Sequence, residues 1–364
     1  MSDMFVRRSS MTHRGVRRGL GPDAAPGRPR PSVLSLRILM VTGALAWLVV
    51  LVAPGQAGAA ARSFIAGAAD TAESAMTWWK AAILGTVEGL TEYVPVSSTG
   101  HLLVVSDLLG LGDTEADRAA ANTYAIAIQF GAIIAVAGLF WRRFVAMVQG
   151  LFGRSEEGRH LLVITVIAFV PAAVVGFLFD DAIEERLFGP WPIVAAWFVG
   201  GVAILLLERA NLIPHGGSDA ASLGEEDPAR GRDPLLAITN RQALLIGLAQ
   251  VLALWPGTSR SLATILGALL VGVGMRAAVE FSFVLGFVTL SAATFYSLAS
   301  DGGGLFEQFG VIDPLIGLVF AFLSAVVAIR WMISYLERNS LAIFGWYRIV
   351  VALLAAGLAV VGTI

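Results

Sequence analysis

The 364-residue sequence contains no cysteine and few charged residues, and both shortages narrow the range of functions. Without cysteine there can be no disulfide, no thiolate nucleophile and no cysteine-ligated metal site. Charged residues make up 14% of the chain, well below the roughly 25% that is usual in soluble globular proteins. With 57% hydrophobic residues and a mean hydropathy of +0.76, the composition indicates an all-α, polytopic membrane protein that contacts the bilayer.

The chain also lacks an excess of basic residues and contains only four histidines. The net charge of -2 leaves no basic surface to neutralise a phosphate backbone, so we predict no nucleic-acid partner. His101 is the one histidine in a polar cluster within an apolar region, whereas His13, His160 and His215 lie in charged or loop-like surroundings. His101 is therefore the histidine that we consider for a functional site.

The first 74 residues differ in composition from the rest of the chain. Residues 1–37 are rich in Arg, Pro and Ser without apolar periodicity, and we expect them to be disordered and cytoplasmic. An apolar stretch and a run of small residues follow, so residues 38–74 form either a cleavable signal-like segment or a retained anchor helix with a linker. The two readings are equally favoured, and a misassigned start codon upstream is a third explanation.

Residues 75–364 are expected to form one membrane domain of two repeats, about 75–209 and 241–364, with a cytoplasmic linker at 210–240. The charges of the loops, read with the positive-inside rule, assign each apolar segment a direction across the membrane. Acidic loops near residues 113–117 and 180–185 are placed outside. The expected segments are 78–90, 102–111, 124–140, 161–179 and 193–207, then 242–255, 262–273, 279–298, 314–329 and 343–361.

Each repeat begins with an apolar segment that breaks at a proline and then turns back. The first segment breaks at Pro95 and enters from the outside, and the second breaks at Pro256 and enters from the inside. This pattern is typical of inverted-topology repeats, whose re-entrant half-helices meet near the middle of the bilayer. We therefore predict two re-entrant helix hairpins. A weak internal match pairs Gly85 with Gly247, Glu88 with Gln250, Tyr93 with Trp255, Ser97 with Ser259, and Thr99 with Ser261.

The first break carries polar side chains that are costly at membrane depth unless they serve a function. Two carboxylates lie four residues apart on one helical face, and the helix must end near Val94 because Pro95 follows it. Hydroxyl groups and backbone donors then begin the next helix, where an anion is favoured. Simple capping and exposure to an aqueous vestibule explain single members better than the whole set. The set comprises Glu88, Glu92, Ser97, Ser98, Thr99, Gly100 and His101.

The second break adds the cation that the first one lacks. Arg260 is predicted at a helix N-terminus, where its charge has the wrong sign for the helix dipole. A bound anion would satisfy it, and the planar guanidinium is suited to phosphate. The alternative is an internal ion pair with Glu88 or Glu92, and both states can occur within one turnover. The candidate residues here are Gly257, Ser259, Arg260, Ser261 and Thr264.

Two carboxylates beside a diphosphate would repel it, and a single arginine cannot balance them. Either a divalent cation bridges carboxylate and phosphate, or one carboxyl group is protonated. Oxygen ligands favour Mg²⁺ or Ca²⁺, with Glu88 and Glu92 as the candidate metal ligands.

The stretch from Glu88 to His101 and the stretch from Pro256 to Ser261 resemble the two signature motifs of the undecaprenyl-diphosphate phosphatase family of the bacitracin-resistance type. The resemblance extends from about residue 75 to the C-terminus and takes in residues 126–131, 141–143, 281–283 and 347–348. It implies a multi-pass enzyme of the bacterial inner membrane that hydrolyses a polyprenyl diphosphate lipid and needs a divalent cation. It also implies a site open to the periplasm.

The resemblance implies roles for residues of this chain. Glu92 would be the more directly catalytic acid of the pair, Ser98 a candidate nucleophile, His101 an acid/base or rival nucleophile, and Arg260 the phosphate ligand. Leu262 departs from the glycine that many members carry, which casts doubt on the shape of that turn. The implied phosphate-binding positions are Ser97, Thr99, Gly100, Gln129, Gly257, Ser259, Ser261 and Thr264.

A secondary transporter or lipid flippase for polyprenyl phosphate is the alternative, because broken helices in inverted repeats are a transporter feature. A nucleophile beside acid and base groups favours the enzyme, because transport needs no nucleophile. The sequence does not choose among Ser98, His101 and water as nucleophile, and it leaves a homodimer open.

Overall fold

The computed structural model describes residues 76–112, 115–213, 233–301 and 312–364. Within these ranges the chain forms helices and turns and no strand, which confirms the all-α prediction. Six of the described helices are long and apolar enough to cross a membrane. The predictions for residues 1–37 and 38–74, and most of those for the linker 210–240, fall outside the described residues.

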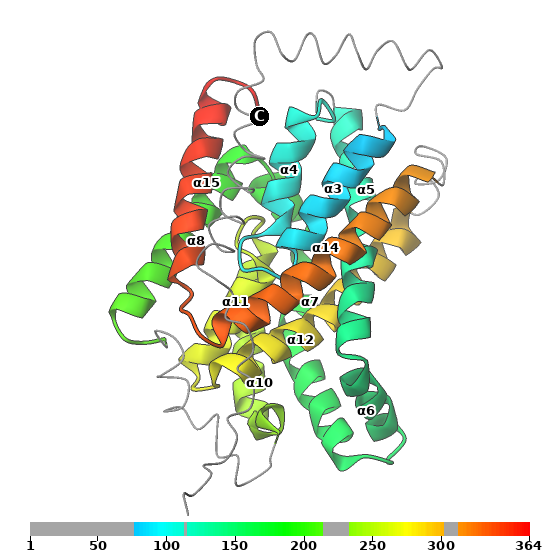
Figure 1. The fold of residues 1–364 in the computed structure, drawn as a ribbon, viewed down its shortest axis with the longest axis vertical. Helices are drawn as coiled ribbons and strands as arrows, with labels where there is room; N and C mark the ends of the chain where they lie inside the picture. Colours follow the sequence, from blue (N-terminus) through cyan, green and yellow to red (C-terminus); the bar gives the residue numbers. More distant parts are fainter. Residues whose placement is uncertain (1–75, 113–114, 214–232, 302–311) are drawn as a thin grey trace, which may run out of the picture. The chain divides into compact units, whose positions relative to one another are not determined.

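The helices follow one another in the order that the two predicted repeats require (Figure 1). The first repeat contains α3 (Trp78–Thr91), α4 (Ser98–Leu108), α5 (Glu115–Leu139), α6 (Trp141–Leu151), α7 (Glu156–Leu187) and α8 (Pro190–Arg209). The 3-10 helix η2 (Pro234–Ala237) lies in the predicted linker, and the second repeat contains α10 (Asn240–Val251), η3 (Leu252–Leu254), α11 (Arg260–Leu270), α12 (Met275–Asp301), α14 (Ile312–Leu336) and α15 (Ala342–Val360).

Both broken segments lie where the sequence predicts them. Helix α3 ends at Thr91, before Pro95, and α4 begins at Ser98. In the second repeat α10 begins with a capping box of Thr239 and Gln242 and passes through η3, and α11 begins after Pro256 and Gly257. The two helix–turn–helix units fit re-entrant hairpins.

The first helix of each repeat packs against a helix of the other repeat, an arrangement that we call exchanged packing. Helix α3 packs along α14 of the second repeat (Figure 1), and α10 packs along α7 of the first. A Cβ atom on Gly85 of α3 would lie 2.1 Å from the carbonyl oxygen of Gly317, and one on Gly247 of α10 would lie 2.4 Å from that of Ala168. Small residues allow such close helix contacts in membranes. The equivalence of Gly85 and Gly247 fits an inverted repeat.

We expect Gly85→Ala to destabilise the protein, because the added methyl group would meet backbone atoms of α14 that cannot rotate away. Overpacking of this kind costs about 1–3 kcal/mol, which thermal unfolding in detergent would detect as a lower midpoint. Gly138→Ala on α5 is the matched control, because nothing lies within 4 Å of its added Cβ. Equal midpoints for the two variants would contradict the close contact.

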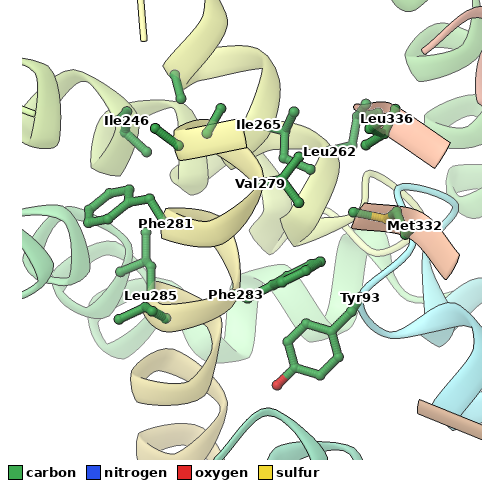
Figure 2. Close-up of a cluster of buried hydrophobic side chains, with 14 of the residues drawn as sticks. Tyr93, Ile246, Leu262, Ile265, Val279, Phe281, Phe283, Leu285, Met332 and Leu336 are labelled. Carbon is green, nitrogen blue, oxygen red and sulfur yellow. The ribbon is translucent and has the colours of Figure 1, made fainter. Parts of the chain in front are cut away.

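A hydrophobic core packs around α11, the helix that follows the second turn (Figure 2). Leu262 of α11 is 2% exposed and packs in this core with Phe281 and Phe283 of α12 and Met332 of α14. Tyr93 of the first turn joins the same cluster and meets Phe283 edge to face. The side chain of Leu262 is thus a core residue.

Three local predictions were wrong about helix boundaries. The acidic loop near 113–117 is partly helical, because α5 already begins at Glu115, where acidic residues favour a helix N-terminus. The acidic segment 180–185 continues α7 as helix beyond a non-helical residue, Phe179. Helix α6 was missed altogether, because its arginine pair resembled a loop that ends a membrane segment. In each case the hydropathy pattern marks the apolar part of a helix and not its polar extension.

Candidate active site

The two turns share an unusual backbone geometry. Ser97 has φ 73° and ψ 107°, and Ser259 has φ 75° and ψ 117°, and each residue precedes the first residue of its half-helix. Positive φ values are sparsely populated by residues other than glycine and cost about 1–3 kcal/mol when imposed. Such strain gathers at functional sites. Ser97 and Ser259, which the weak internal match pairs, thus have the same backbone conformation.

The residue after each of these serines differs in chemistry. Ser98 begins α4, and Arg260 begins α11, so the two repeats place a hydroxyl group and a guanidinium at equivalent positions. Glu92, at the end of α3, connects them. Its Oε1 atom accepts a hydrogen bond from Arg260 Nη2 at 3.0 Å, and its Oε2 atom accepts one from the Ser98 hydroxyl. The acid of one turn, its serine and the arginine of the other turn therefore form one buried cluster.

Arg260 is held by more than its ion pair. Its Nη1 atom donates to the carbonyl oxygen of Ser282 at 3.2 Å, and its guanidinium carbon lies 5.3 Å from the centre of the Tyr93 ring. Gly286 provides the space, since a Cβ atom there would lie 2.0 Å from Arg260 Nη1. Ser282 lies in the range 281–283 covered by the resemblance but was not predicted as a site residue, and Gly286 was not singled out, because nothing local links α12 to the motif. These contacts aim the guanidinium at Glu92.

Glu88 lies one turn before Glu92 and is 1% exposed. Its Oε1 atom, the Tyr93 hydroxyl and Arg260 Nε are buried and have no hydrogen-bond partner in the part of the chain that the structure describes. Buried polar atoms are normally satisfied. Three of them on neighbouring side chains around the ion pair indicate that a polar ligand belongs here.

Glu88 offers a carboxylate oxygen of the kind that suits Mg²⁺ and Ca²⁺, because its Oε1 atom has no partner among the described residues. Both Glu92 oxygens are held by Arg260 and Ser98, so Glu92 would have to give up one of these contacts to join Glu88 as a ligand. The described residues contain no cluster of three or more His, Asp or Glu side chains that could enclose an ion. An ion here would take its other ligands from phosphate and water, which is how Mg²⁺ is usually bound.

His101 is buried, and both of its ring nitrogens are engaged by the protein. Nδ1 lies 2.6 Å from the carbonyl oxygen of Ser97, and Nε2 lies 2.8 Å from the hydroxyl oxygen of Tyr347 on α15. The ring packs between Trp197 of α8 and Tyr347. No hydrogen bond joins it to Ser98 or Glu92 among the described residues.

The hydroxyl groups of the second turn bind mostly to the protein itself. Ser261 donates to the carbonyl oxygen of Val94 at 3.1 Å and so ties the two turns together. Ser259 accepts a hydrogen bond from the amide of Leu262 and caps α11. Thr264 lies 2.6 Å from the Ser282 hydroxyl oxygen. By contrast, no side chain of the described residues caps the N-terminus of α4, which leaves that end able to bind an anion.

The remaining predicted residues differ in position. Thr99 is exposed at the start of α4, and Gly100 allows close packing, since a Cβ atom there would lie 2.5 Å from Trp197. Gln129 of α5 accepts a hydrogen bond from Thr294 of α12 at 3.3 Å. No hydrogen bond connects Gln129 to either turn in the described ranges, so its assignment to phosphate binding stays a prediction.

A cavity of about 540 Å³ lies elsewhere, lined by apolar residues together with charged residues of α6, α7 and α12 and Glu337 just after α14. None of the predicted site residues lines it. The ion pair between Arg260 and Glu92 is instead almost fully buried, since the two side chains are 10% and 6% exposed.

Comparison with known proteins gives a consistent result. Residues 81–354 match the family model described as bacitracin resistance protein BacA. The chain is 42% identical over 275 residues to an undecaprenyl-diphosphatase of Sorangium cellulosum, covering 75% of this chain and 84% of that protein. It is 42% identical over 284 residues to undecaprenyl-diphosphatase 2 of Rhodospirillum rubrum, covering 78% and 94%. It is 41% identical over 290 residues to an undecaprenyl-diphosphatase of Methylococcus capsulatus, covering 79% and 94%.

The matched range includes both turns, the ion pair between them and all the site residues described above. With the family model matching most of the chain and relatives aligned over most of their own length, the chain belongs to the bacitracin resistance protein BacA family.

Proposed function

We propose that this chain is an undecaprenyl-diphosphate phosphatase. It would hydrolyse the polyprenyl diphosphate lipid to the monophosphate and inorganic phosphate, and so return the lipid carrier to cell-wall synthesis. Relatives named undecaprenyl-diphosphatase support the reaction. The observation that carries the proposal is Glu92, whose two oxygens hold the Ser98 hydroxyl and the Arg260 guanidinium, supplied by opposite turns.

The geometry favours Ser98 as nucleophile and Glu92 as its base. The Ser98 hydroxyl already donates to Glu92, so Glu92 can take the proton as the serine oxygen attacks the terminal phosphorus. The bond from phosphorus to the bridging oxygen then breaks, and the lipid monophosphate leaves. Glu92 gives up the first proton as the lipid monophosphate departs. Water next attacks the phosphoserine and passes a proton to Glu92, the bond from phosphorus to the Ser98 oxygen breaks, and Glu92 returns that proton to the Ser98 oxygen as inorganic phosphate is released.

Charge stabilisation is the main demand of phosphoryl transfer. Arg260 would exchange part of its ion pair with Glu92 for the phosphoryl oxygens, and the uncapped N-terminus of α4 would add backbone donors. Glu88 and Glu92 would hold Mg²⁺ or Ca²⁺, which when bound neutralises charge on the diphosphate. Ser97, Thr99 and Gly100 lie at the same helix start and would line the phosphate site.

We place the protein in the bacterial inner membrane, with its site reached from the periplasmic side and the prenyl chain in the bilayer. Six membrane-length apolar helices support a multi-pass protein. A homodimer stays a prediction.

The test is phosphate release by the purified full-length protein in detergent micelles. We expect inorganic phosphate from undecaprenyl diphosphate with Mg²⁺ or Ca²⁺, a loss of release with EDTA, and recovery when either ion is restored. Glu88→Gln should need a higher ion concentration for half-maximal rate, because the oxygen that lacks a protein partner would no longer carry charge. No release, together with lipid counterflow in liposomes, would support the transporter instead.

A further inference from the structure

Four successive carbonyl groups of the first turn are each bound by a side chain from a different helix. Ser261 of α11 donates to the oxygen of Val94 at 3.1 Å, and Arg348 of α15 donates to that of Pro95 at 3.4 Å. Trp197 of α8 donates to the oxygen of Val96 at 2.8 Å, and His101 of α4 lies 2.6 Å from that of Ser97. Backbone at membrane depth must find partners within the protein. These four hydrogen bonds also fix the direction in which each of the four carbonyl groups points.

Arg348 of α15 binds carbonyl groups of both turns. Arg348 is 0% exposed and has no carboxylate within salt-bridge distance in the described chain. Its Nη2 atom donates to the carbonyl oxygens of Gly257 at 2.8 Å and of Ala196 at 3.0 Å. Because its Nη1 atom binds Pro95, one guanidinium joins the first turn to the second and both to α8.

Two glycines of α8 leave space for the Arg348 guanidinium and for α15. A Cβ atom on Gly200 would lie 2.4 Å from Arg348 Nη2, so any other residue there would collide with the charged group. A Cβ on Gly201 would lie 2.7 Å from the carbonyl oxygen of Gly345, which lets α15 pack closely on α8. Glycine at these two positions of α8 therefore allows Arg348 to reach both turns from α15.

Tyr347 acts on the first turn through His101. The Ser97 carbonyl can only accept a hydrogen bond, so a neutral His101 carries its proton on Nδ1 and accepts from the Tyr347 hydroxyl at Nε2. In the second turn the residue equivalent to His101 is Ala263, and there the Ser259 carbonyl accepts the Ala263 amide at 3.0 Å. The first turn thus uses a side chain for a carbonyl that the second turn satisfies with its own backbone.

The orientation of these carbonyls decides where the amides point. A trans peptide group is planar, so the N–H of each residue points opposite to the carbonyl of the residue before it. The Val96 carbonyl points to Trp197, and the Ser97 carbonyl points to His101. The Ser97 and Ser98 amides therefore point away from these side chains, and neither donates to another described residue.

We propose that Tyr347 and Arg348 are positioning residues for the reaction. They hold the carbonyl side of the first turn against α8 and α15, which presents the Ser97 and Ser98 amides and the Ser98 hydroxyl to the transferring phosphoryl group. This role rests on the proposed hydrolysis and extends it to two residues that the two signature motifs do not contain. Because both residues act through the backbone of the first turn, we expect their effect on the chemical step and not on binding.

The test compares Tyr347→Phe with Tyr335→Phe in the full-length protein. Tyr347→Phe removes only the hydroxyl that holds His101, and we expect kcat to fall about tenfold with KM unchanged. Tyr335 lies on α14 and packs against Trp331 and Phe344, away from both turns, so its variant should keep the wild-type kcat. Thermal midpoints measured alongside would show that both proteins are folded.

Arg348 is tested by Arg348→Gln and Arg348→Met, which have similar size and no charge. The partners of Arg348 are carbonyl groups, so an amide with two N–H donors should retain several-fold more kcat than the thioether. Equal rates for the two would overturn the role of Arg348. Where Arg348→Met does not fold, Tyr347→Phe decides the outcome.

Two failures can be told apart. A wild-type protein that releases no phosphate would overturn the proposed function, and this role with it. An active wild-type protein, with Tyr347→Phe as fast as Tyr335→Phe or with its loss confined to KM, would overturn the positioning role alone.

Discussion

Arg260→Met should lose phosphate release by about 10²-fold to 10³-fold, which is the usual effect of removing one group that stabilises charge in the transition state. The loss should lie mainly in kcat, because Arg260 gains its phosphate contact as charge develops. It should exceed the effect of Arg260→Lys, which keeps the charge but loses the planar fork. Initial rates with saturating lipid would measure all three proteins.

Stability has to be separated from catalysis in this variant. Removing Arg260 leaves Glu92 buried beside the Ser98 hydroxyl without its ion partner, and breaking a buried pair on one side commonly costs about 3–5 kcal/mol. Glu92→Gln combined with Arg260→Met removes both charges, so it should unfold at a higher temperature than Arg260→Met while remaining inactive. Arg330→Ala on the exposed face of α14 is the control. A fully active Arg260→Met protein would contradict the proposed site.

Ser98→Ala should lower kcat by about 10³-fold or more, because it removes the nucleophile and not a supporting contact. Rapid acid quenching of wild-type protein with lipid labelled in the terminal phosphate should trap the label on Ser98, and the variant should trap none. Ser106→Ala, a buried serine on the same helix, should behave like the wild type.

The label also separates the alternatives for the nucleophile. A phosphohistidine would assign the attack to His101, against the geometry in which both ring nitrogens bind protein groups. Label on neither residue, with Ser98→Ala still active, would assign the attack to water activated by Glu92.

The parts of the site that the sequence predicted are those with a local signal. Proline and glycine mark both turns, and the excess of polar residues at membrane depth marks Glu88 and Glu92 as candidate functional residues. The pairing of Arg260 with Glu92 was an alternative to phosphate binding, and the structure contains that ion pair. Complementary charges on two predicted half-helices were enough to suggest that they meet.

The parts that the sequence did not predict depend on distant residues. The sequence predicted His101 as an acid/base or rival nucleophile, and only the fold shows that the hydroxyl of Tyr347, 246 residues away along the chain, lies at hydrogen-bond distance from its Nε2 atom. Arg348 lies in an apolar helix and binds backbone carbonyls, which leave no pattern in a sequence. Gly286 and Gly200 leave room for the side chains of Arg260 and Arg348, which come from other helices. The local sequence therefore does not show why glycine is needed at either position.

The exchanged packing of α3 on α14 and of α10 on α7 has a consequence for biosynthesis. The ribosome completes α3 long before it reaches Ile312, where its partner helix begins. Until then α3 lacks its main packing partner, and Arg348 has not yet been made. A nascent chain that already contains both motifs would thus be inert, and hydrolysis would begin only after the last helices have been inserted into the membrane.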